Sequence, residues 1–292
     1  MTSRSPIALR ASLATAIVLG VVALAGCGAS GVVSTTQLTV MGSTTLDPIT
    51  QVAAEQFMAA NPGTRVMASG VGSSAGIEAV SKGTCEIGTS SRDLKSAEMT
   101  QTVDGVTFSL VETEVARDAI AVIVNPENPV TSLTTSQVAD IFAGKIKNWN
   151  EVCPPGVTYD YAIGLVNRDE ASGTREAFSK LVMRGLDFDP TAAVLPGTGQ
   201  VRAVVAQSKI AVGYISLGFV KGSPVKALII DGVTPTEANV ANGTYPVKRN
   251  LYFITKGEPQ GLALRFIRFM LSPEIQDKVV LDGGFLPIGG GD

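Results

Sequence analysis

The sequence predicts an α/β fold. Short apolar runs of strand length alternate with stretches that have the periodicity of amphipathic helices. The predicted strands in the first part of the chain are each followed by Gly, Ser or Thr, residues typical of turns and helix starts. Repeated βα units favour a largely parallel sheet, in which ligands bind at the carboxyl ends of the strands. With 292 residues, two lobes are as compatible with the length as one domain.

The predicted elements of a first lobe come first along the chain. They alternate strictly between strand and helix, and each helix begins at a hydroxyl-rich or Pro-containing turn. Strands are predicted at 38–41, 65–69 and 87–89, and helices at 48–60 and 75–81.

The crossing into a second lobe is expected just before the strand 120–124, which ends at the Pro-rich turn 125–129. The last segments, with a return strand at 251–255, are expected to rejoin the first lobe. The second lobe is predicted to hold helices at 136–142, 174–182 and 200–206 and strands at 163–166, 212–215 and 225–230; the helix 260–271 and the segment 273–288 rejoin the first lobe.

The amino-terminal stretch indicates export. Arg4 and Arg10 precede an apolar run, 11–25, that is shorter than the ~20 residues of a membrane-spanning helix. The run ends in Leu-Ala-Gly-Cys, which resembles the lipobox of bacterial lipoproteins. The sequence therefore predicts a signal peptide at 1–26, lipidation of Cys27, and a flexible tether at 27–36.

Composition excludes several classes of function. The formal net charge is −3, and removal of the signal peptide, with its two arginines, makes it more negative. This balance argues against a nucleic-acid partner, which requires a positive surface. The chain has no histidine, so a Ser-His-Asp triad and a His-ligated metal are excluded. We therefore predict no enzyme, no cofactor and no metal. Cys85 and Cys153 could pair in an exported protein or stay free.

Three hydroxyl-rich turns lie at predicted strand-to-helix junctions, at 42–45, 72–76 and 171–174. Such a turn offers backbone N–H groups, a helix dipole and short donor side chains, which together bind anions. One such turn alone is more typical of an ordinary helix cap. Three of them, with Arg168 just before the third, predict an anion site.

Eight segments between Leu38 and Ile288 carry a family resemblance: GSTTLDPI, GVGSSAGI, EIGTSSRDL, ARDAIAVIVN, IFAGKIKNWNEV, LVNRDEASGTREAF, IAVGYISLGFV and FLPI. They resemble, in the expected order, the phosphate-binding proteins of Pst-type ABC importers. The Arg-x-x-x-Ser-Gly-Thr element at 168–174 is the most specific of them. The resemblance implies a two-lobed periplasmic-binding-protein fold of type II, in which each lobe is a mixed sheet flanked by helices and a two-segment hinge joins the lobes.

The resemblance also implies which residues bind inorganic phosphate. These are hydroxyl side chains, backbone N–H groups of the turns and one arginine. Matched residue by residue, they are Thr44, Thr45, Ser73, Arg168, Ser172, Gly173 and Thr174, together with Ser91 at the position where better-known members have an aspartate.

That missing aspartate matters for selectivity. In relatives it accepts the proton that phosphate carries near neutral pH and sulfate lacks, so a buried carboxylate can discriminate ~10⁴-fold between the two ions. Because Ser91 stands here instead, we look for another carboxylate near the hinge. Asp118 is the first candidate, Asp93 the second and Asp47 the third. The alternative is that Asp118 is a hinge residue paired with Arg117 or a backbone N–H.

The arginines near the turns have two interpretations each. Arg168 is expected to make a bidentate contact to the ligand, with Asp169 and Glu170 holding its guanidinium. The alternative is a surface ion pair of little energetic value. Arg92 could add a second positive group or pair with Asp93.

The resemblance implies an extracytoplasmic lipoprotein that captures phosphate and delivers it to the permease of an ABC importer. We expect a monomer, anchored to the outer face of the cytoplasmic membrane through its lipid. The lobes are predicted at 37–116 with 252–292 and at 117–251, with hinge crossings near 115–120 and 248–254. Alternatives are a receptor for sulfate, molybdate or tungstate, or a phosphate-sensing surface protein without a role in transport.

Overall fold

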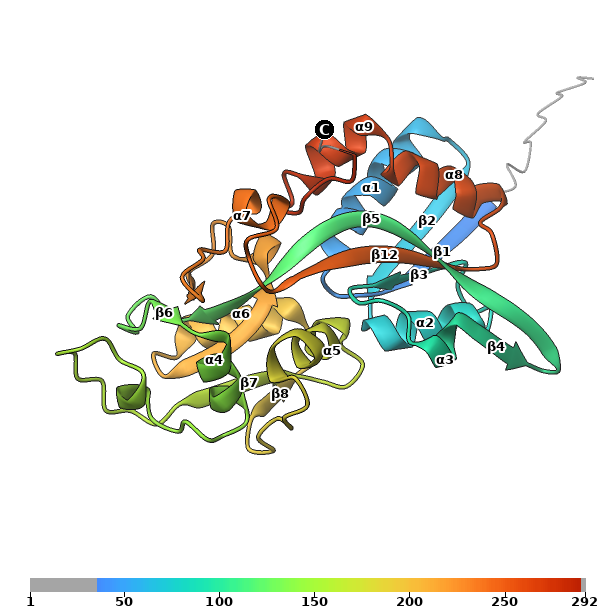
Figure 1. Ribbon diagram of the computed structural model, residues 1–292. Helices are drawn as coiled ribbons and strands as arrows, with labels where there is room; N and C mark the ends of the chain where they lie inside the picture. Colours follow the sequence, from blue (N-terminus) through green and yellow to red (C-terminus); the bar gives the residue numbers. More distant parts are fainter. Residues whose placement is uncertain (1–35, 290–292) are drawn as a thin grey trace, which may run out of the picture. The chain divides into compact units, whose positions relative to one another are not determined.

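The computed structural model describes residues 36–289 (Figure 1). The predicted signal peptide, the lipidated Cys27 and the tether up to residue 35 lie outside the described residues. Within 36–289, no helix has both the length and the apolar character needed to cross a bilayer.

The first group of elements builds a βαβ arrangement at the start of the chain, to which the last helices return. β1 pairs in parallel with both β2 and β3. α1 starts with Pro48 in its first turn, where a proline lacks no required hydrogen bond. The group comprises β1 (Thr36–Gly42), α1 (Asp47–Ala60), β2 (Thr64–Gly70), α2 (Ser73–Ser81), β3 (Ile87–Ser90), α3 (Ser96–Met99), β4 (Thr100–Val103), α8 (Gly261–Met270) and α9 (Pro273–Ile275).

The second group lies between the two long strands in sequence. β7 pairs in parallel with β8 and β9, and α4 begins with a capping box of Thr134 and Gln137. A π-helical turn, Ser179–Met183, extends α5. The group comprises β6 (Ser132–Leu133), α4 (Thr135–Phe142), β7 (Gly164–Arg168), α5 (Gly173–Phe178), β8 (Ala193–Leu195), α6 (Thr198–Gln207), β9 (Ala211–Ser216), β10 (Lys226–Ala227), β11 (Ile229–Ile230) and α7 (Glu237–Ala241).

Two long antiparallel strands connect the groups: β5 (Val106–Val124) and β12 (Lys248–Lys256). They run side by side through the middle of Figure 1. The sheet order is β2-β1-β3-β12-β5-β9-β7-β8, so one continuous path of strands passes through both groups.

Two large clusters of buried apolar side chains form separate cores. One contains Trp149 and Phe178 of the second group, and the other contains Phe57 and Phe266, whose rings meet edge to face at 5.4 Å. Burial of each such side chain stabilises the fold by roughly 1.5–3 kcal/mol. We call the elements around the Phe57 core the first lobe and those around the Trp149 core the second lobe.

The change from one core to the other occurs at matching places on the two long strands. On β5 it lies between Ala116 and Ala119, and at β12 it lies between Val247 and Leu251. The residues in between belong to neither apolar core. This short stretch contains Asp118 and Arg249, which are buried and charged.

The predicted α/β fold is confirmed, and most predicted strands and helices are present. The expectation of a largely parallel sheet is wrong at its centre, where β5 is antiparallel to β12 and β9, and β12 is antiparallel to β3. The reason is that the chain leaves the first lobe along β5 and returns along β12 in the opposite direction. The strand predicted at 120–124 is only the end of β5, and the one predicted at 225–230 is divided into β10 and β11.

Candidate functional site

Three strand-to-helix turns meet between the two cores. Thr45 Oγ1, from the first turn, lies 3.0 Å from Thr174 Oγ1, which is 129 residues away in sequence. Ser73 Oγ, at the start of α2, accepts the backbone N–H of Ser91 at 3.1 Å. All four residues are buried. The fold therefore brings the hydroxyl groups singled out in the sequence into one cluster.

The start of α5 packs against this cluster without room for a side chain. A Cβ atom on Gly173 would lie 2.3 Å from Ser73 Oγ and 2.8 Å from Ser91 Oγ. Ser172 caps the helix, because its Oγ accepts the backbone N–H of Arg175 at 3.2 Å. The hydroxyl hydrogen of Ser172 and the N–H groups of Gly173 and Thr174 are therefore free to donate to a ligand.

Arg168 lies at the end of β7 and is 2% exposed. Its Nε and Nη2 donate to the carbonyl oxygens of Leu195 and Pro196 at 3.1 and 2.8 Å. Its Nη1 and Nη2 also donate to the hydroxyls of Thr198 and Thr44 at 3.2 and 3.1 Å. Burial lowers the pKa of Arg168, although an arginine remains charged in a protein. The guanidinium is held by neutral groups from both lobes.

Neither of the two carboxylates expected to hold Arg168, Asp169 and Glu170, makes a hydrogen bond to its guanidinium. Glu170 has a side chain that is 91% exposed, and its nearest cation is Arg175 at 4.0 Å. Asp169 acts on Arg168 through its negative charge, which partly offsets the effect of burial on the pKa. The prediction for Glu170 is therefore wrong, because its side chain projects outward from the turn after β7 and the Leu195 and Pro196 carbonyls take its place.

Arg249, on β12, is a second buried arginine in the cluster. Its Nε and Nη2 donate to Asp118 Oδ2 at 3.0 and 2.7 Å. Nη1 donates to the carbonyl of Ser91 at 3.2 Å and to Thr174 Oγ1 at 2.9 Å, and Nη2 donates to Thr45 Oγ1 at 3.3 Å. Unlike Arg168, this guanidinium is paired with a carboxylate.

The two arginines share one arrangement, because each donates to two threonine hydroxyls, one from each lobe. A hydroxyl has two acceptor lone pairs and one hydrogen. When an arginine occupies a lone pair, the hydrogen remains available to another acceptor. The cluster therefore offers hydroxyl donors, the positive charge of Arg168 and the N–H donors of the charge-balanced Arg249 to a tetrahedral oxyanion. The threonine pairs are Thr44 with Thr198 at Arg168, and Thr45 with Thr174 at Arg249.

Asp118 lies in the same cluster, on β5 opposite Arg249. It is 1% exposed, and its Oδ1 accepts the hydroxyl of Ser216 at 2.8 Å. Burial raises the pKa of Asp118, and the charge of Arg249 opposes that shift. Three donor atoms, Ser216 Oγ and Arg249 Nε and Nη2, therefore surround the two oxygens of one buried carboxylate.

Neither of the other two carboxylate candidates hydrogen-bonds to this cluster. Asp93 has a half-exposed side chain that accepts the hydroxyl of Tyr252 at 3.0 Å. Asp47 stands partly buried at the start of α1, where its carboxylate accepts the Gln51 amide at 3.0 Å. The alternative pairing of Asp118 with Arg117 is wrong, since Arg117 pairs with Glu114 at 2.8 Å.

Comparison with known proteins identifies the family. A sequence model described as a PBP superfamily domain matches residues 30–274. The phosphate-binding protein PstS of Bacillus subtilis is 36% identical over 252 residues, which are 86% of this chain and 80% of that protein. The chain belongs to the PstS family.

Solved structures agree with this assignment. A phosphate ABC transporter substrate-binding protein from Clostridium perfringens with bound phosphate has a TM-score of 0.78 and 35% identity, covering 87% of this chain and all of that one. An ABC-type phosphate transport receptor from Vibrio cholerae has a TM-score of 0.69 and 33% identity, covering 86% of this chain and all of that one. The predicted family resemblance is confirmed.

Two residues of the cluster in this PstS-family chain, Arg249 and Thr198, were not predicted from the sequence. Arg249 has no motif around it, and its partner Asp118 is 131 residues away in sequence. Thr198 could have been found, because it opens α6 within a Gly-Thr-Gly turn of the same type as the other three. Arg249 could not be found because its partners are distant in sequence. Thr198 could have been found by the same search for strand-to-helix turns that found the other three.

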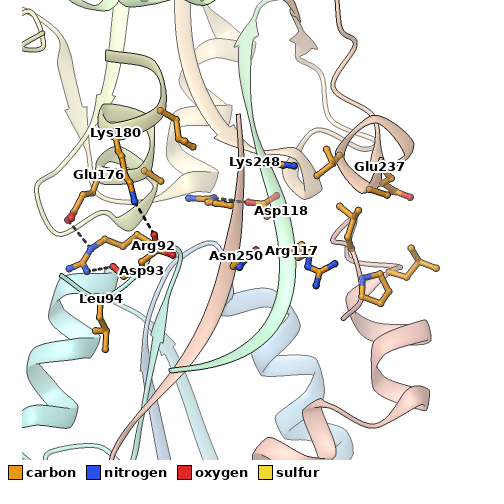
Figure 2. Close-up of a pocket in the computed structure, with 18 of the residues that line it drawn as sticks. Arg92, Asp93, Leu94, Arg117, Asp118, Glu176, Lys180, Glu237, Lys248 and Asn250 are labelled. Carbon is orange, nitrogen blue, oxygen red and sulfur yellow. Dashed lines mark hydrogen bonds and ion pairs between the residues drawn. The ribbon is translucent and has the colours of Figure 1, made fainter. Parts of the chain in front are cut away.

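Beside the cluster, ion pairs connect the lobes across a cleft of about 980 Å³ (Figure 2). Arg92 is 4% exposed and pairs with Glu98 of its own lobe at 2.7 Å. On its other side, Arg92 Nε lies 2.8 Å from a carboxylate oxygen of Glu176 on α5. Lys180, one helical turn further, pairs with Asp93 at 3.2 Å. Arg92 donates to the backbone carbonyl of Asp93, so the predicted side-chain pairing with Asp93 is wrong.

The cysteines and possible metal ligands form no second site in the described part of the chain. Cys85 and Cys153 are both free, and burial raises the pKa of the Cys85 thiol to about 11. Among residues 36–289, no group of three or more potential metal ligands comes together.

Proposed function

We propose that the protein captures inorganic phosphate outside the cytoplasm and delivers it to an ABC importer. The names of its relatives support phosphate as the ligand. The observation that carries the proposal is the pairing of two buried arginines with threonine hydroxyls from both lobes. Binding without catalysis accords with the sequence, which has no histidine to act as a general base for the serines of the cluster.

In this proposal, phosphate lies among the hydroxyl groups and displaces the hydrogen bonds that they make to one another. The ion accepts hydrogen bonds from the two arginines, from hydroxyl side chains, and from N–H groups at the starts of α1, α2 and α5. The proposed ligand residues are Thr44, Thr45, Ser73, Ser91, Arg168, Ser172, Gly173 and Thr174, to which we add Thr198 and Arg249.

We also propose that the two lobes move about the long strands. We keep as a proposal the lobe bounds predicted from the sequence, 37–116 with 252–292 and 117–251, except that Leu251 packs in the core of the first lobe. Closure around phosphate would exclude water and strengthen each hydrogen bond to the ion. The hinge would then lie where β5 and β12 pass from one core to the other.

Asp118 is our proposed acceptor for the phosphate proton. Two of its three donors belong to the charged guanidinium of Arg249, whereas the third, the Ser216 hydroxyl, can rotate away. A phosphate O–H could take that position on Oδ1. Sulfate has no such proton, so the Ser216 hydroxyl would stay bonded to Asp118 Oδ1. The negative charge of sulfate would then lie near the carboxylate with no hydrogen bond between them.

The variant Asp118→Asn tests this role by isothermal titration with phosphate and with sulfate. If Asp118 accepts the proton, phosphate binding weakens by roughly 1.5–3 kcal/mol while sulfate binding improves. If Asp118 only holds Arg249, both ions lose affinity by the same factor. The second result would overturn the proton-acceptor role and leave the anion site intact.

For the location of the protein we propose export, lipidation of Cys27 and attachment to the outer face of the cytoplasmic membrane as a monomer. The partner would be the transmembrane permease of the importer. Metabolic labelling with a fatty acid, with Cys27→Ser as the matched control, tests the anchor. Labelling of the Cys27→Ser protein would contradict it.

Titration of the purified protein with phosphate, sulfate, molybdate and tungstate tests the ligand. We expect phosphate to bind and the other ions to bind at least ~10⁴-fold more weakly. Tighter binding of another oxyanion would overturn the proposal. Growth of a deletion strain on limiting phosphate separates transport from a purely sensory role, because a sensor without a transport function would leave uptake of labelled phosphate unchanged.

A further inference from the structure

A buried hydrogen bond lies directly behind Arg168. The Tyr214 hydroxyl, on β9, donates to Asn167 Oδ1 at 2.5 Å, and the same oxygen accepts the backbone N–H of Arg168 at 2.8 Å. Tyr214 is fully buried, and Asn167 is 3% exposed. One side-chain oxygen therefore joins the strand that carries Arg168 to the neighbouring strand.

This contact takes the place of β7–β9 pairing, which ends before it reaches Arg168. β7 pairs with β9 only at Gly164 and Leu165, while on its other edge it pairs with β8 as far as Arg168. The Arg168 N–H points to the edge where β9 has diverged, and the Asn167 side chain takes the place of a carbonyl of β9. Without this acceptor, the buried N–H would lose a hydrogen bond.

The ring of Tyr214 also contacts the anion-site helix. It stacks on Phe178, the last residue of α5, with the ring centroids 4.0 Å apart and the planes 6° apart. Gly173 and Thr174 open the same helix. Burial raises the pKa of Tyr214 far above its ordinary value, so its hydroxyl remains a donor at every physiological pH.

We propose that Tyr214, acting through Asn167, is a positioning residue that fixes Arg168 for the anion. It does not touch the anion itself. The ring holds α5 and the hydroxyl holds the end of β7, so one side chain sets the spacing between Arg168 and the first turn of α5. This inference rests on the proposed function in that the anion of the site is taken to be phosphate.

The first test compares Tyr214→Phe with Tyr245→Phe. Both tyrosines are fully buried in the second lobe, and the Tyr245 hydroxyl donates to the Ile120 carbonyl at 3.1 Å. Each variant keeps its ring and loses one hydrogen bond, so their midpoints in urea should fall similarly. We expect Tyr214→Phe to bind phosphate about tenfold more weakly and Tyr245→Phe less than about twofold more weakly. Equal affinities of the two variants would overturn the inference.

The second test does not depend on phosphate. The Nε–H resonance of Arg168 in an ¹⁵N NMR spectrum is identified by its loss in Arg168→Lys. In the protein without added anion, we expect Tyr214→Phe to shift or broaden this resonance and Tyr245→Phe to leave it in place. An unchanged resonance in Tyr214→Phe would overturn the positioning role. If the unaltered protein fails to bind phosphate, the proposed function fails, and this spectrum still decides whether Tyr214 positions Arg168.

Discussion

Arg168 and Arg249 face the same cluster of hydroxyls, yet they are held in opposite ways. The partners of Arg168 are carbonyl oxygens and hydroxyls, all of them neutral. Arg249 makes two hydrogen bonds to the buried carboxylate of Asp118. Both arginines donate to one threonine of each lobe, so the difference lies only in what balances their charge.

This difference separates two tasks. The charge of Arg168 has no carboxylate in direct contact, so an anion that enters the site supplies its counter-charge. The charge of Arg249 is already balanced within the fold, and its ion pair joins β5 to β12 where the cores change. We therefore expect Arg168 to contribute mainly to anion affinity and Arg249 mainly to the stability of the junction.

The largest effect is expected from Arg249→Met. It would leave Asp118 buried without its cation, which typically costs about 3–5 kcal/mol of folding free energy. Arg168→Met removes donors from neutral oxygens only, and we expect a loss of about 1–3 kcal/mol. Urea unfolding of both variants measures the difference. Equal losses would show that the two arginines do not differ in this way.

A double variant provides the control for that experiment. Arg249→Met combined with Asp118→Leu removes both charges of the pair, so no charge is left uncompensated. Replacement of a complete buried pair by apolar groups is often neutral. The double variant should therefore be more stable than Arg249→Met alone. If it is less stable, the loss comes from the packing of Arg249 and not from the unpaired carboxylate.

The second effect concerns affinity. Arg168→Met should weaken phosphate binding on the order of 100-fold, because charge-assisted hydrogen bonds to the ion are lost. Arg202→Met is a matched control, since Arg202 packs over the ring of Phe219 in the same lobe and lies outside the cluster. Isothermal titration should find the control within about twofold of the unaltered protein. If Arg168→Met still binds phosphate with the affinity of the unaltered protein, Arg168 does not contribute to the anion site.

The same comparison explains what could be predicted from the sequence. Arg168 lies within a few residues of Ser172, Gly173 and Thr174, so a local pattern of charge, hydroxyl and glycine indicates an anion site. The alternating strands and helices around the turns are equally local. The α/β fold and the hydroxyl turns were therefore predictable.

Arg249 was not predictable, because its role depends on pairing between distant parts of the chain. Its neighbours Asp118 and Thr45 are 131 and 204 residues away. The antiparallel β5–β12 pair has the same cause, since strand direction depends on where the chain returns. The prediction for Glu170 failed because nearness in sequence does not decide which way a side chain points.

The smallest effect concerns Arg92, a third buried arginine whose carboxylate partners are partly exposed. Burial acts to raise the pKa of Glu98, but hydrogen bonds from Arg92 and the Lys95 N–H outweigh it and hold that pKa below its ordinary value of 4.5. A carboxyl with a lowered pKa stabilises the fold above its unfolded pKa, and this contribution is lost as the pH falls through the folded pKa.

Glu98→Gln should therefore destabilise the protein at pH 7 by less than about 1 kcal/mol, because the pair is partly exposed to solvent. The gap between the variant and the unaltered protein should narrow as the pH falls below 4.5, the ordinary pKa of a glutamate, and close once the pH passes through the lowered pKa of the folded state. Glu274→Gln is the control, since Glu274 is 72% exposed and pairs with Lys278 at the surface. Thermal unfolding between pH 3 and 7 measures both variants. If the stability difference between Glu98→Gln and the unaltered protein stays constant over this range, the hydrogen-bond geometry and not the charge makes the contribution. Arg92 would then resemble Arg168, which neutral partners hold, and not Arg249, which a carboxylate holds.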